Sequence, residues 1–277
     1  MKKILLLLLF SISFAFSQES INYQTPSSEI LELVEYDRPP SVTYDRDKNF
    51  MLFLYRDNYK SIEDLSQKEL RLAGLRINPK KNIGSRITYY NNVKIKNLKS
   101  KNPEINDIIG IPNNPLIANI NWSPNQKNIA FTNTSSDGVR LWVLNLESRS
   151  LTKLSDLKLN SNIGDVINWV NDNEIIVKVI PENKQNLIDQ DGIVPMGPTI
   201  SSNEGENAQN RTYQDLLKNK TDEFNFEQLV TSDLYLINLN GKTQKWLDAD
   251  MYTSISPSPD GNFIMVNNIK KPFSYIV

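Results

Sequence analysis

The chain has 277 residues, 39% hydrophobic and 23% charged, a composition ordinary for a soluble globular protein. Its 31 basic and 32 acidic residues give a net charge of -1, which argues against the broad basic face of a nucleic-acid-binding protein. The absence of histidine excludes a Ser-His-Asp triad, and the absence of both histidine and cysteine excludes the usual zinc sites. The chain also has no G-x-S-x-G nucleophile elbow, and we expect neither a metal nor a cofactor.

Residues 1–17 have the pattern of a signal peptide. Lys2 and Lys3 form a positive n-region, residues 4–16 a short apolar h-region, and residues 15–17 an A-x-A-like cleavage site before Gln18. About thirteen apolar-biased residues are too few for a bilayer span, which needs roughly twenty, so an uncleaved anchor is the lesser alternative. The signal peptide predicts a periplasmic or secreted protein that has no membrane contact after cleavage. A bacterial periplasm suits a chain of this size without cysteine.

The next segment leads into the first of several similar units. Residues 18–40 are polar and expected to be extended, with one short apolar-periodic piece at residues 30–34 and a stop at Pro39-Pro40. Residues 42–44, a polar turn and residues 50–55 then read as two strands. Capping-box patterns at Ser61 and Ser66 predict a short helix over residues 62–73 that ends at Gly74. Strand-like pieces return at residues 86–90 and 93–98.

Residues 117–154 contain the clearest unit. A strand end, a tight turn at Pro124-Asn125, an apolar strand, the hairpin signal Asp137-Gly138 and a third strand follow one another. A third copy begins near residue 166 and a fourth near residue 254. If Tyr44, Ser123, Val170 and Ser258 are taken as equivalent, the Ser123–Val170 interval is close to the propeller repeat of roughly 40–50 residues.

These units predict an all-β chain, an incomplete β-propeller of about four blade units over residues 41–277. Two long insertions, at about 56–100 and 181–231, separate the copies. Closed propellers have typically 4–8 blades, and the last unit stops within a strand. We therefore expect an N-terminal fragment of a larger protein.

Several motifs resemble those of the glutamyl endopeptidases, a branch of the prolyl oligopeptidase family of serine peptidases. The resemblance extends over essentially everything after the signal peptide, and its motifs lie partly in the insertions, which a generic propeller would not reproduce. They are residues 26–30, 39–40, 70–78, 82, 85–86, 89–90, 195–198, 211–217, 252–254 and 271–275.

The resemblance implies a seven- or eight-bladed propeller capping an α/β-hydrolase domain that cleaves peptides after glutamate. The sequence stops before any such domain, so no catalytic residue can be assigned and the chain alone is expected to be inactive. The expected role is that of a substrate-gating propeller, and the expected partners are peptide substrates rather than nucleic acid. The alternative is a stand-alone periplasmic propeller that binds a protein partner.

Three arginines in the insertions are candidates for binding a substrate carboxylate: Arg76, Arg86 and Arg211. A guanidinium pairs with a carboxylate in bidentate fashion, which suits selection of glutamate. The alternative is that these arginines bridge the insertions to neighbouring blades.

Two other patterns have structural explanations. Asp45, Asp47 and Asn49 have the spacing of a calcium loop, but Phe50 and Arg56 replace its required glycine and glutamate, so a blade turn is expected. Trp122 and Trp169 occupy the same repeat position, which favours packing between blades over a ligand box.

Overall fold

The computed structural model describes residues 24–189 and 215–273, so the predicted signal peptide lies outside the described residues. The chain divides into two compact units, residues 1–37 and 38–277. In the first unit, α2 (Ser28–Val34) is a short helix whose last turn is closed by the Glu35 N–H donating to the Leu31 carbonyl at 2.7 Å. An extended segment was expected here, but apolar residues at helical spacing form a helix instead.

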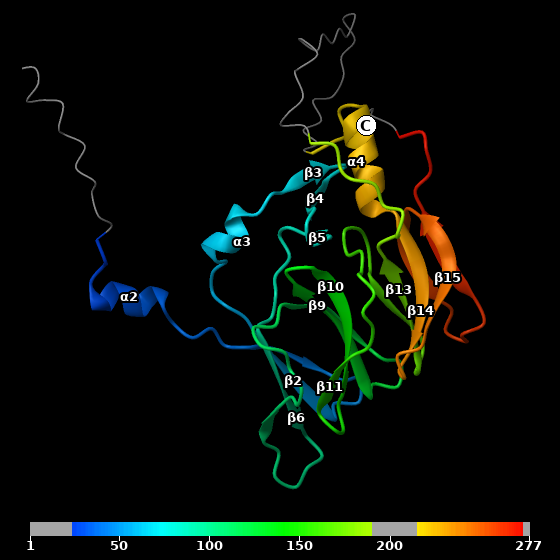
Figure 1. Ribbon diagram of the computed structural model, residues 1–277. Coiled ribbons are helices and arrows are strands. Elements are labelled where there is room, and N and C mark those ends of the chain that lie inside the picture. The colour runs from blue at the N-terminus through cyan, green and yellow to red at the C-terminus, as the bar shows by residue number, and fades with distance from the viewer. Residues whose placement is uncertain (1–23, 190–214, 274–277) are drawn as a thin grey trace, which may run out of the picture. The chain divides into compact units, whose positions relative to one another are not determined.

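The second unit is predominantly β (Figure 1). Its described residues form five antiparallel sheets, and four of these follow one another nearly in chain order. The second sheet has the order β11-β10-β9-β8, and each strand is joined to the next by a hairpin or short loop. The prediction of successive small antiparallel sheets is therefore confirmed. The strands of the four sheets are β1 (Ser41–Tyr44), β2 (Phe50–Tyr55), β6 (Asn92–Asn97) and β7 (Ile105–Asp107); β8 (Ile117–Trp122), β9 (Asn128–Ser135), β10 (Gly138–Asn145) and β11 (Ser150–Lys153); β12 (Ile167–Asn171), β13 (Glu174–Val179), β14 (Ser232–Asn238) and β15 (Thr243–Asp250); β16 (Tyr252–Pro257) and β17 (Ile264–Asn268).

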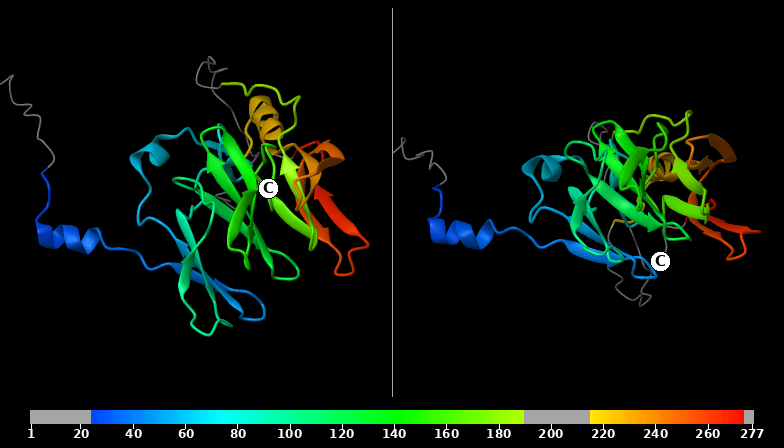
Figure 2. Two further views of the ribbon diagram at one scale, coloured as in Figure 1. Left: turned by 60° about the horizontal axis from the view of Figure 1, so that its bottom comes forward. Right: turned by 90° about the horizontal axis from the view of Figure 1, so that it is seen from below.

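Neighbouring sheets pack face to face, because alternate side chains of a strand point to opposite faces. In β9, Ile129 and Phe131 pack toward the first sheet, whereas Ala130 packs toward the third. In β13, Ile175 packs toward the second sheet and Ile176 toward the fourth. Both faces of the central sheets are therefore apolar, and Figure 2 shows the sheets side by side in chain order.

The turn between the first two strands recurs in three sheets with the same hydrogen bond. A side-chain oxygen accepts the backbone N–H five residues later: Asp45 from Phe50 at 2.6 Å, Ser123 from Asn128 at 3.0 Å and Ser258 from Phe263 at 3.0 Å. The position equivalent to Ser123 is thus Asp45, one residue beyond the predicted Tyr44. The carboxylate of Asp45 is buried and committed to this turn, as expected of a blade turn.

The first strands of the second and third sheets are linked through a tryptophan. The Trp169 indole N–H donates to the Asn121 carbonyl at 3.2 Å, and the Asn121 amide donates to the Ile167 carbonyl at 3.0 Å. Trp169 is buried between these sheets, and Trp122 packs against the cluster between the first and second sheets. The predicted packing role of both tryptophans is confirmed.

The first insertion leaves the sheet after β2 and returns at β6, so it comprises residues 56–91 and ends before the predicted residue 100. Ser61 caps α3 (Ile62–Ser66) by accepting the Asp64 N–H at 3.0 Å. The helix predicted to continue to residue 73 stops there. Residues 70–78 form a hairpin instead, with positive φ angles of 51° at Ala73 and 79° at Gly74 in its turn. The strands of this small sheet are β3 (Leu70–Leu72), β4 (Leu75–Asn78) and β5 (Ile83–Gly84).

The second insertion contains α4 (Lys220–Val230), which packs on the β3–β4 hairpin (Figure 1). We call this packing region the satellite cluster; its buried members are Leu72, Ile77, Leu217, Phe226, Leu229, Val230 and Met251. Asn160 holds the C-terminal end of the helix by donating to the carbonyls of Leu229 and Thr231 at 2.9 and 3.0 Å. The two insertions therefore share one hydrophobic core.

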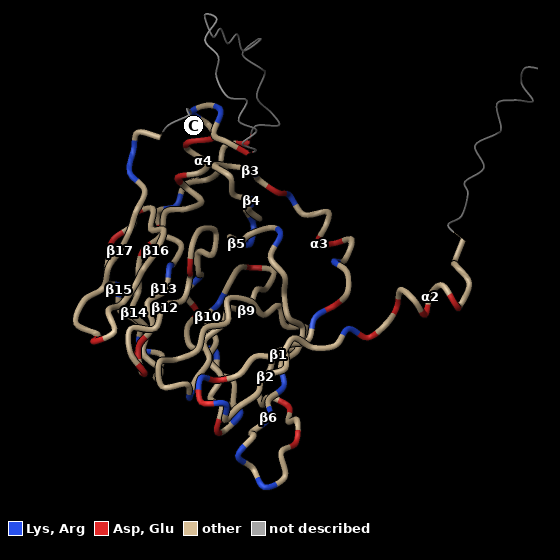
Figure 3. The backbone as a smooth tube through the Cα atoms, turned by 180° about the vertical axis from the view of Figure 1, so that it is seen from behind, with Lys and Arg blue, Asp and Glu red and all other residues tan. Residues whose placement is uncertain are grey.

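Charged residues of both signs are interspersed along the chain (Figure 3). Within residues 24–189 and 215–273, none of the helices has the length and apolar character needed to cross a bilayer.

Candidate functional site

The first insertion forms most of a cavity of about 680 Å³. Its wall combines residues 56–89 with Arg38, which precedes β1, and Leu116, which precedes β8. Three acidic side chains line it: Asp57, Asp64 and Glu69. Six basic side chains line it: Arg38, Arg56, Lys60, Arg71, Lys81 and Arg86. The cavity therefore has an excess of positive charge in a chain whose total charge is close to zero.

Local backbone signals place these side chains. The strand β2 ends at Tyr55, so Arg56 starts the loop that leaves the sheet. The Ser61 cap starts α3 immediately after Lys60, and β5 ends at Gly84 immediately before Ser85 and Arg86. The cavity thus lies where the end of β2, the start of α3 and the small sheet that contains β5 meet.

Glu69 is the centre of the polar network on one side of the cavity. Its carboxylate accepts from Ser85 Oγ at 2.5 Å, from Arg71 Nε at 2.9 Å and from Arg86 Nε at 3.3 Å. The hydrogen bond from Ser85, followed by those from Arg86 and Arg71, lowers the pKa of Glu69 to about 2 against an opposing effect of burial. Glu69 is therefore ionised throughout the neutral range.

The structure separates the three arginines proposed from the sequence. Arg86 lines the cavity and is paired with Glu69. Arg76 lies elsewhere: its Nε is 2.9 Å from Asp215 Oδ2, and both side chains are largely buried. This ion pair joins the two insertions to each other, whereas the alternative expected from the sequence was a bridge from an insertion to a neighbouring blade. Arg211 lies outside the described residues.

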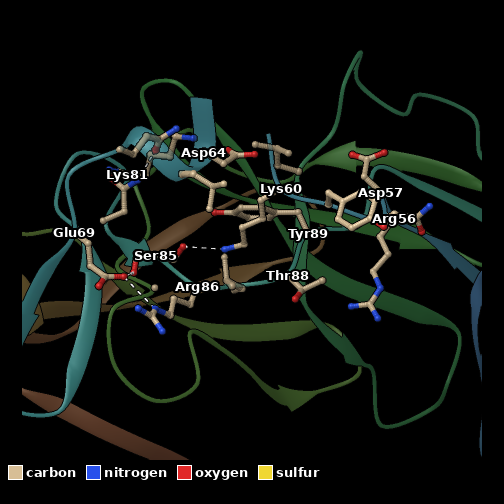
Figure 4. Close-up of a pocket in the computed structure, with 18 of the residues that line it drawn as sticks. Arg56, Asp57, Lys60, Asp64, Glu69, Lys81, Ser85, Arg86, Thr88 and Tyr89 are labelled. Atoms are coloured by element: carbon tan, nitrogen blue, oxygen red, sulfur yellow. Dashed lines mark hydrogen bonds and ion pairs between the residues drawn. The ribbon is translucent and has the colours of Figure 1, made fainter. Parts of the chain in front are cut away.

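Sequence reasoning missed Arg56, which has no family motif around it. The Arg56 Nε is buried and has no hydrogen-bond partner among the described residues. Figure 4 shows Arg56 on the opposite side of the cavity from Arg86, with Lys60 between them. The signal available in the sequence was the position of Arg56, a cation directly after an apolar strand.

The other wall groups complete the chemistry of the cavity. Lys60 Nζ donates to the Ser85 carbonyl at 3.1 Å, and burial raises the pKa of the Tyr89 phenol, which keeps it neutral. Among the residues that the structure describes, no three acidic side chains are arranged to hold a metal ion. The arrangement can bind and orient an anionic group through cations and hydrogen-bond donors.

Comparison with known proteins gives a similarity that extends over nearly the whole chain. No protein-family model matches. The chain is 34% identical over 274 residues to the probable chloroplastic glutamyl endopeptidase of Oryza sativa subsp. japonica, covering 94% of this chain and 29% of that protein. For the Arabidopsis thaliana protein of the same name the identity is 32% over 267 residues, with coverages of 92% and 28%.

Solved structures give only weak likenesses. The acylaminoacyl peptidase of Pyrococcus horikoshii has a TM-score of 0.32 at 16% identity, covering 86% of this chain and 36% of that chain. A putative dipeptidyl aminopeptidase IV of Bacteroides ovatus has a TM-score of 0.29 at 14% identity, covering 81% and 36%. Such scores are too low to identify a fold. The similarity that carries weight is therefore to the two chloroplast proteins, and the chain spans less than a third of their length.

Proposed function

We propose that this chain is the propeller part of a serine endopeptidase that hydrolyses peptides after glutamate. The observation that carries the proposal is the identity of 32–34% with two probable glutamyl endopeptidases across more than nine tenths of the chain. The repeated antiparallel sheets, stacked face to face, are consistent with about four blades of an incomplete propeller. The chemistry itself belongs to an α/β-hydrolase domain that follows in the whole protein.

In this proposal the propeller admits peptides and the first insertion helps to select them. Arg86 is the best placed of the three arginines, because it lines the cavity and its side chain is 61% exposed. Arg76 has a weaker claim, because it does not line the cavity and its side chain is only 24% exposed in its pair with Asp215. Arg211 remains a candidate for binding the substrate carboxylate, because it lies in one of the motifs that resemble the glutamyl endopeptidases.

The test compares the whole gene product with the 277-residue chain. Fluorogenic peptides that differ only in glutamate or glutamine before the scissile bond are the substrates. The whole protein is expected to cleave the glutamate peptide at least about tenfold faster, since a charged hydrogen bond to a carboxylate has no equivalent with an amide. The chain alone is expected to be inactive because it lacks histidine.

Two results would contradict the proposal. One is hydrolysis by the purified 277-residue chain. The other is a whole gene product without preference for glutamate: equal cleavage of both peptides would contradict the specificity, and cleavage of neither would favour the stand-alone binding propeller.

The role of Arg86 is tested in the whole protein with Arg86→Gln. Loss of glutamate preference is expected, with the exposed Arg46→Gln variant as a control for one lost positive charge. Unchanged preference in Arg86→Gln would remove Arg86 from the proposal.

We also propose that the protein is exported to the periplasm or secreted after cleavage near Ser17-Gln18. N-terminal sequencing of the protein recovered from its native cell is expected to start at or near Gln18. A mature protein that begins at Met1 would contradict export by a cleaved signal.

A further inference from the structure

The six cations of the cavity fall into two groups. Arg71 and Arg86 share the carboxylate of Glu69, and Lys60 donates to a backbone carbonyl. Arg38, Arg56 and Lys81 have neither an ion-pair partner nor a side-chain hydrogen bond within the described ranges 24–189 and 215–273. Half of the basic side chains in the wall therefore have no internal partner.

The acidic side chains of the wall are already engaged. Glu69 holds Ser85, Arg71 and Arg86. Asp64 accepts from Ser61 Oγ at 2.8 Å, and Asp57 accepts from the Asn91 amide at 2.7 Å. No described acid of the wall is paired with the three remaining cations, so their charge is available to a ligand.

Of these three cations, Arg56 is the strongest candidate for binding an anionic ligand. Its Nε is removed from water and gains no hydrogen bond among the described residues, an arrangement that costs free energy until an acceptor is supplied. The guanidinium plane offers paired donors that match a carboxylate. Lys81 and Arg38 supply further point charges in the same wall.

From this geometry we infer that the cavity binds an acidic peptide segment with two or more carboxylates, and that Arg56 is its main anchor. A volume of about 680 Å³ holds a few residues rather than a whole domain. Apolar wall residues, among them Leu65, Ile87 and Leu116, can cover the aliphatic stems of the acidic side chains. The inference goes beyond the proposed function because it concerns binding by this chain itself, with or without cleavage.

A peptide suits the cavity better than a nucleic acid does. Binding of a nucleic acid strand needs a positive groove that follows its backbone over several nucleotides. Here the cations surround one concavity, and charges of both signs are interspersed elsewhere along the chain (Figure 3).

The experiment measures fluorescence anisotropy with the 277-residue chain and two fluorescein-labelled peptides of alternating glycine and glutamate, or glycine and glutamine. Each peptide carries three of the variable residues. The glutamate peptide is expected to bind about tenfold more tightly, and its affinity is expected to fall as salt is raised. Because no cleavage is involved, a failure here leaves the peptidase proposal intact, and the reverse also holds.

The anchor role is tested with Arg56→Gln, which is expected to weaken binding of the glutamate peptide by about fivefold or more. The matched control is Arg46→Gln, an exposed arginine on the β1–β2 turn, which is expected to stay within about twofold. Circular dichroism verifies that each variant is folded. If Arg56→Gln does not fold, Lys81→Gln replaces it, with an expected loss of about threefold.

Three outcomes would overturn the inference. The first is equal affinity for the glutamate and glutamine peptides. The second is a folded cavity variant that binds as well as the Arg46→Gln control. The third is a single-stranded oligonucleotide of equal charge that displaces the glutamate peptide at lower concentration than unlabelled peptide does.

Discussion

The stacked sheets and the first insertion are stabilised in different ways. β9 and β10 carry apolar side chains on both faces, and these side chains meet residues of the neighbouring sheets. In residues 56–91 the wall of the cavity is held by polar contacts, such as those between Glu69 and Ser85 or between Lys60 and the Ser85 carbonyl. The sheets bury surface that needs no specific partner, whereas the insertion depends on donors and acceptors that are far apart in the chain.

This difference separates framework from site. Burial of apolar surface is non-directional and tolerates many partners, so it suits a repeated framework. Hydrogen-bonded charges require particular partners, and those left without one are available to bind a ligand. The unpaired cations of the cavity belong to the hydrogen-bonded region, at the point where the first insertion joins the apolar sheets.

The largest effect is expected from Leu141→Ala in the core between the second and third sheets. Leu141 is fully buried, and its truncation is expected to lower the free energy of unfolding by about 2–5 kcal/mol. Urea denaturation measures it. The control is Val42→Ala on β1, where the side chain is 43% exposed and the loss is expected to stay below about 1 kcal/mol. Equal losses would mean that the sheets do not form the main core.

A smaller and local effect is expected from Leu229→Ala in the satellite cluster. Leu229 is fully buried between α4 and the β3–β4 hairpin, and a loss of about 2–4 kcal/mol is expected there. Hydrogen exchange is expected to accelerate in α4, β3 and β4 while β9 and β10 keep their protection. Acceleration throughout the sheets would show that framework and insertions unfold as one unit.

A third prediction concerns pH and the buried Lys178 of β13. Its side chain is 1% exposed, its Nζ donates to the Ile163 carbonyl, and burial lowers its pKa to about 8 although Asp165 opposes the shift. The unfolded chain, with a lysine pKa of about 10.4, binds more protons than the folded chain between these two values. Stability contributed by this lysine therefore rises with pH in that window.

Relative to Lys178→Met, the wild-type chain is expected to gain roughly 1–2 kcal/mol of unfolding free energy from pH 8 to pH 10. Lys184, whose pKa burial also lowers to about 8, is present in both proteins and cancels in the difference. Chemical denaturation at pH 8, 9 and 10 measures the gain. Parallel curves for the two proteins would show that Lys178 titrates normally.

The smallest effect is expected from the ion pair between the insertions. In a double-mutant cycle with Arg76→Gln and Asp215→Asn, a coupling energy of about 1 kcal/mol is expected, because the pair is partly shielded from water. The Lys220–Glu223 pair on α4, whose lysine is 85% exposed, serves as the comparison and is expected to couple by less than about 0.5 kcal/mol. Indistinguishable couplings would mean that the bridge between the insertions adds no stability.

The sequence predictions were more accurate for the stacked sheets than for the insertions. The hairpin with the Asp137-Gly138 signal and the turn at Ser123 could be read locally, because each depends on residues within a few positions. The helix predicted over residues 62–73 was wrong beyond Ser66, because Leu70–Leu72 pairs with Leu75–Asn78 and that pairing outweighs weak helical signals.

The residues of the candidate site could be predicted only in part from the sequence. Arg86 was identified and lines the cavity, whereas Arg76, identified by the same reasoning, is paired with Asp215, far away in the sequence. Arg56 was overlooked, because its position directly after an apolar strand does not show whether the cation meets an acid in the folded chain.

The sequence by itself determined the repeated antiparallel units, because alternation and turn chemistry act over a few residues. It also determined that a histidine-dependent catalytic triad is absent from the chain. Only the tertiary structure decided which insertions pack together, which arginines are neutralised and which remain available. Those outcomes depend on contacts between residues such as Arg76 and Asp215, which no local pattern brings together.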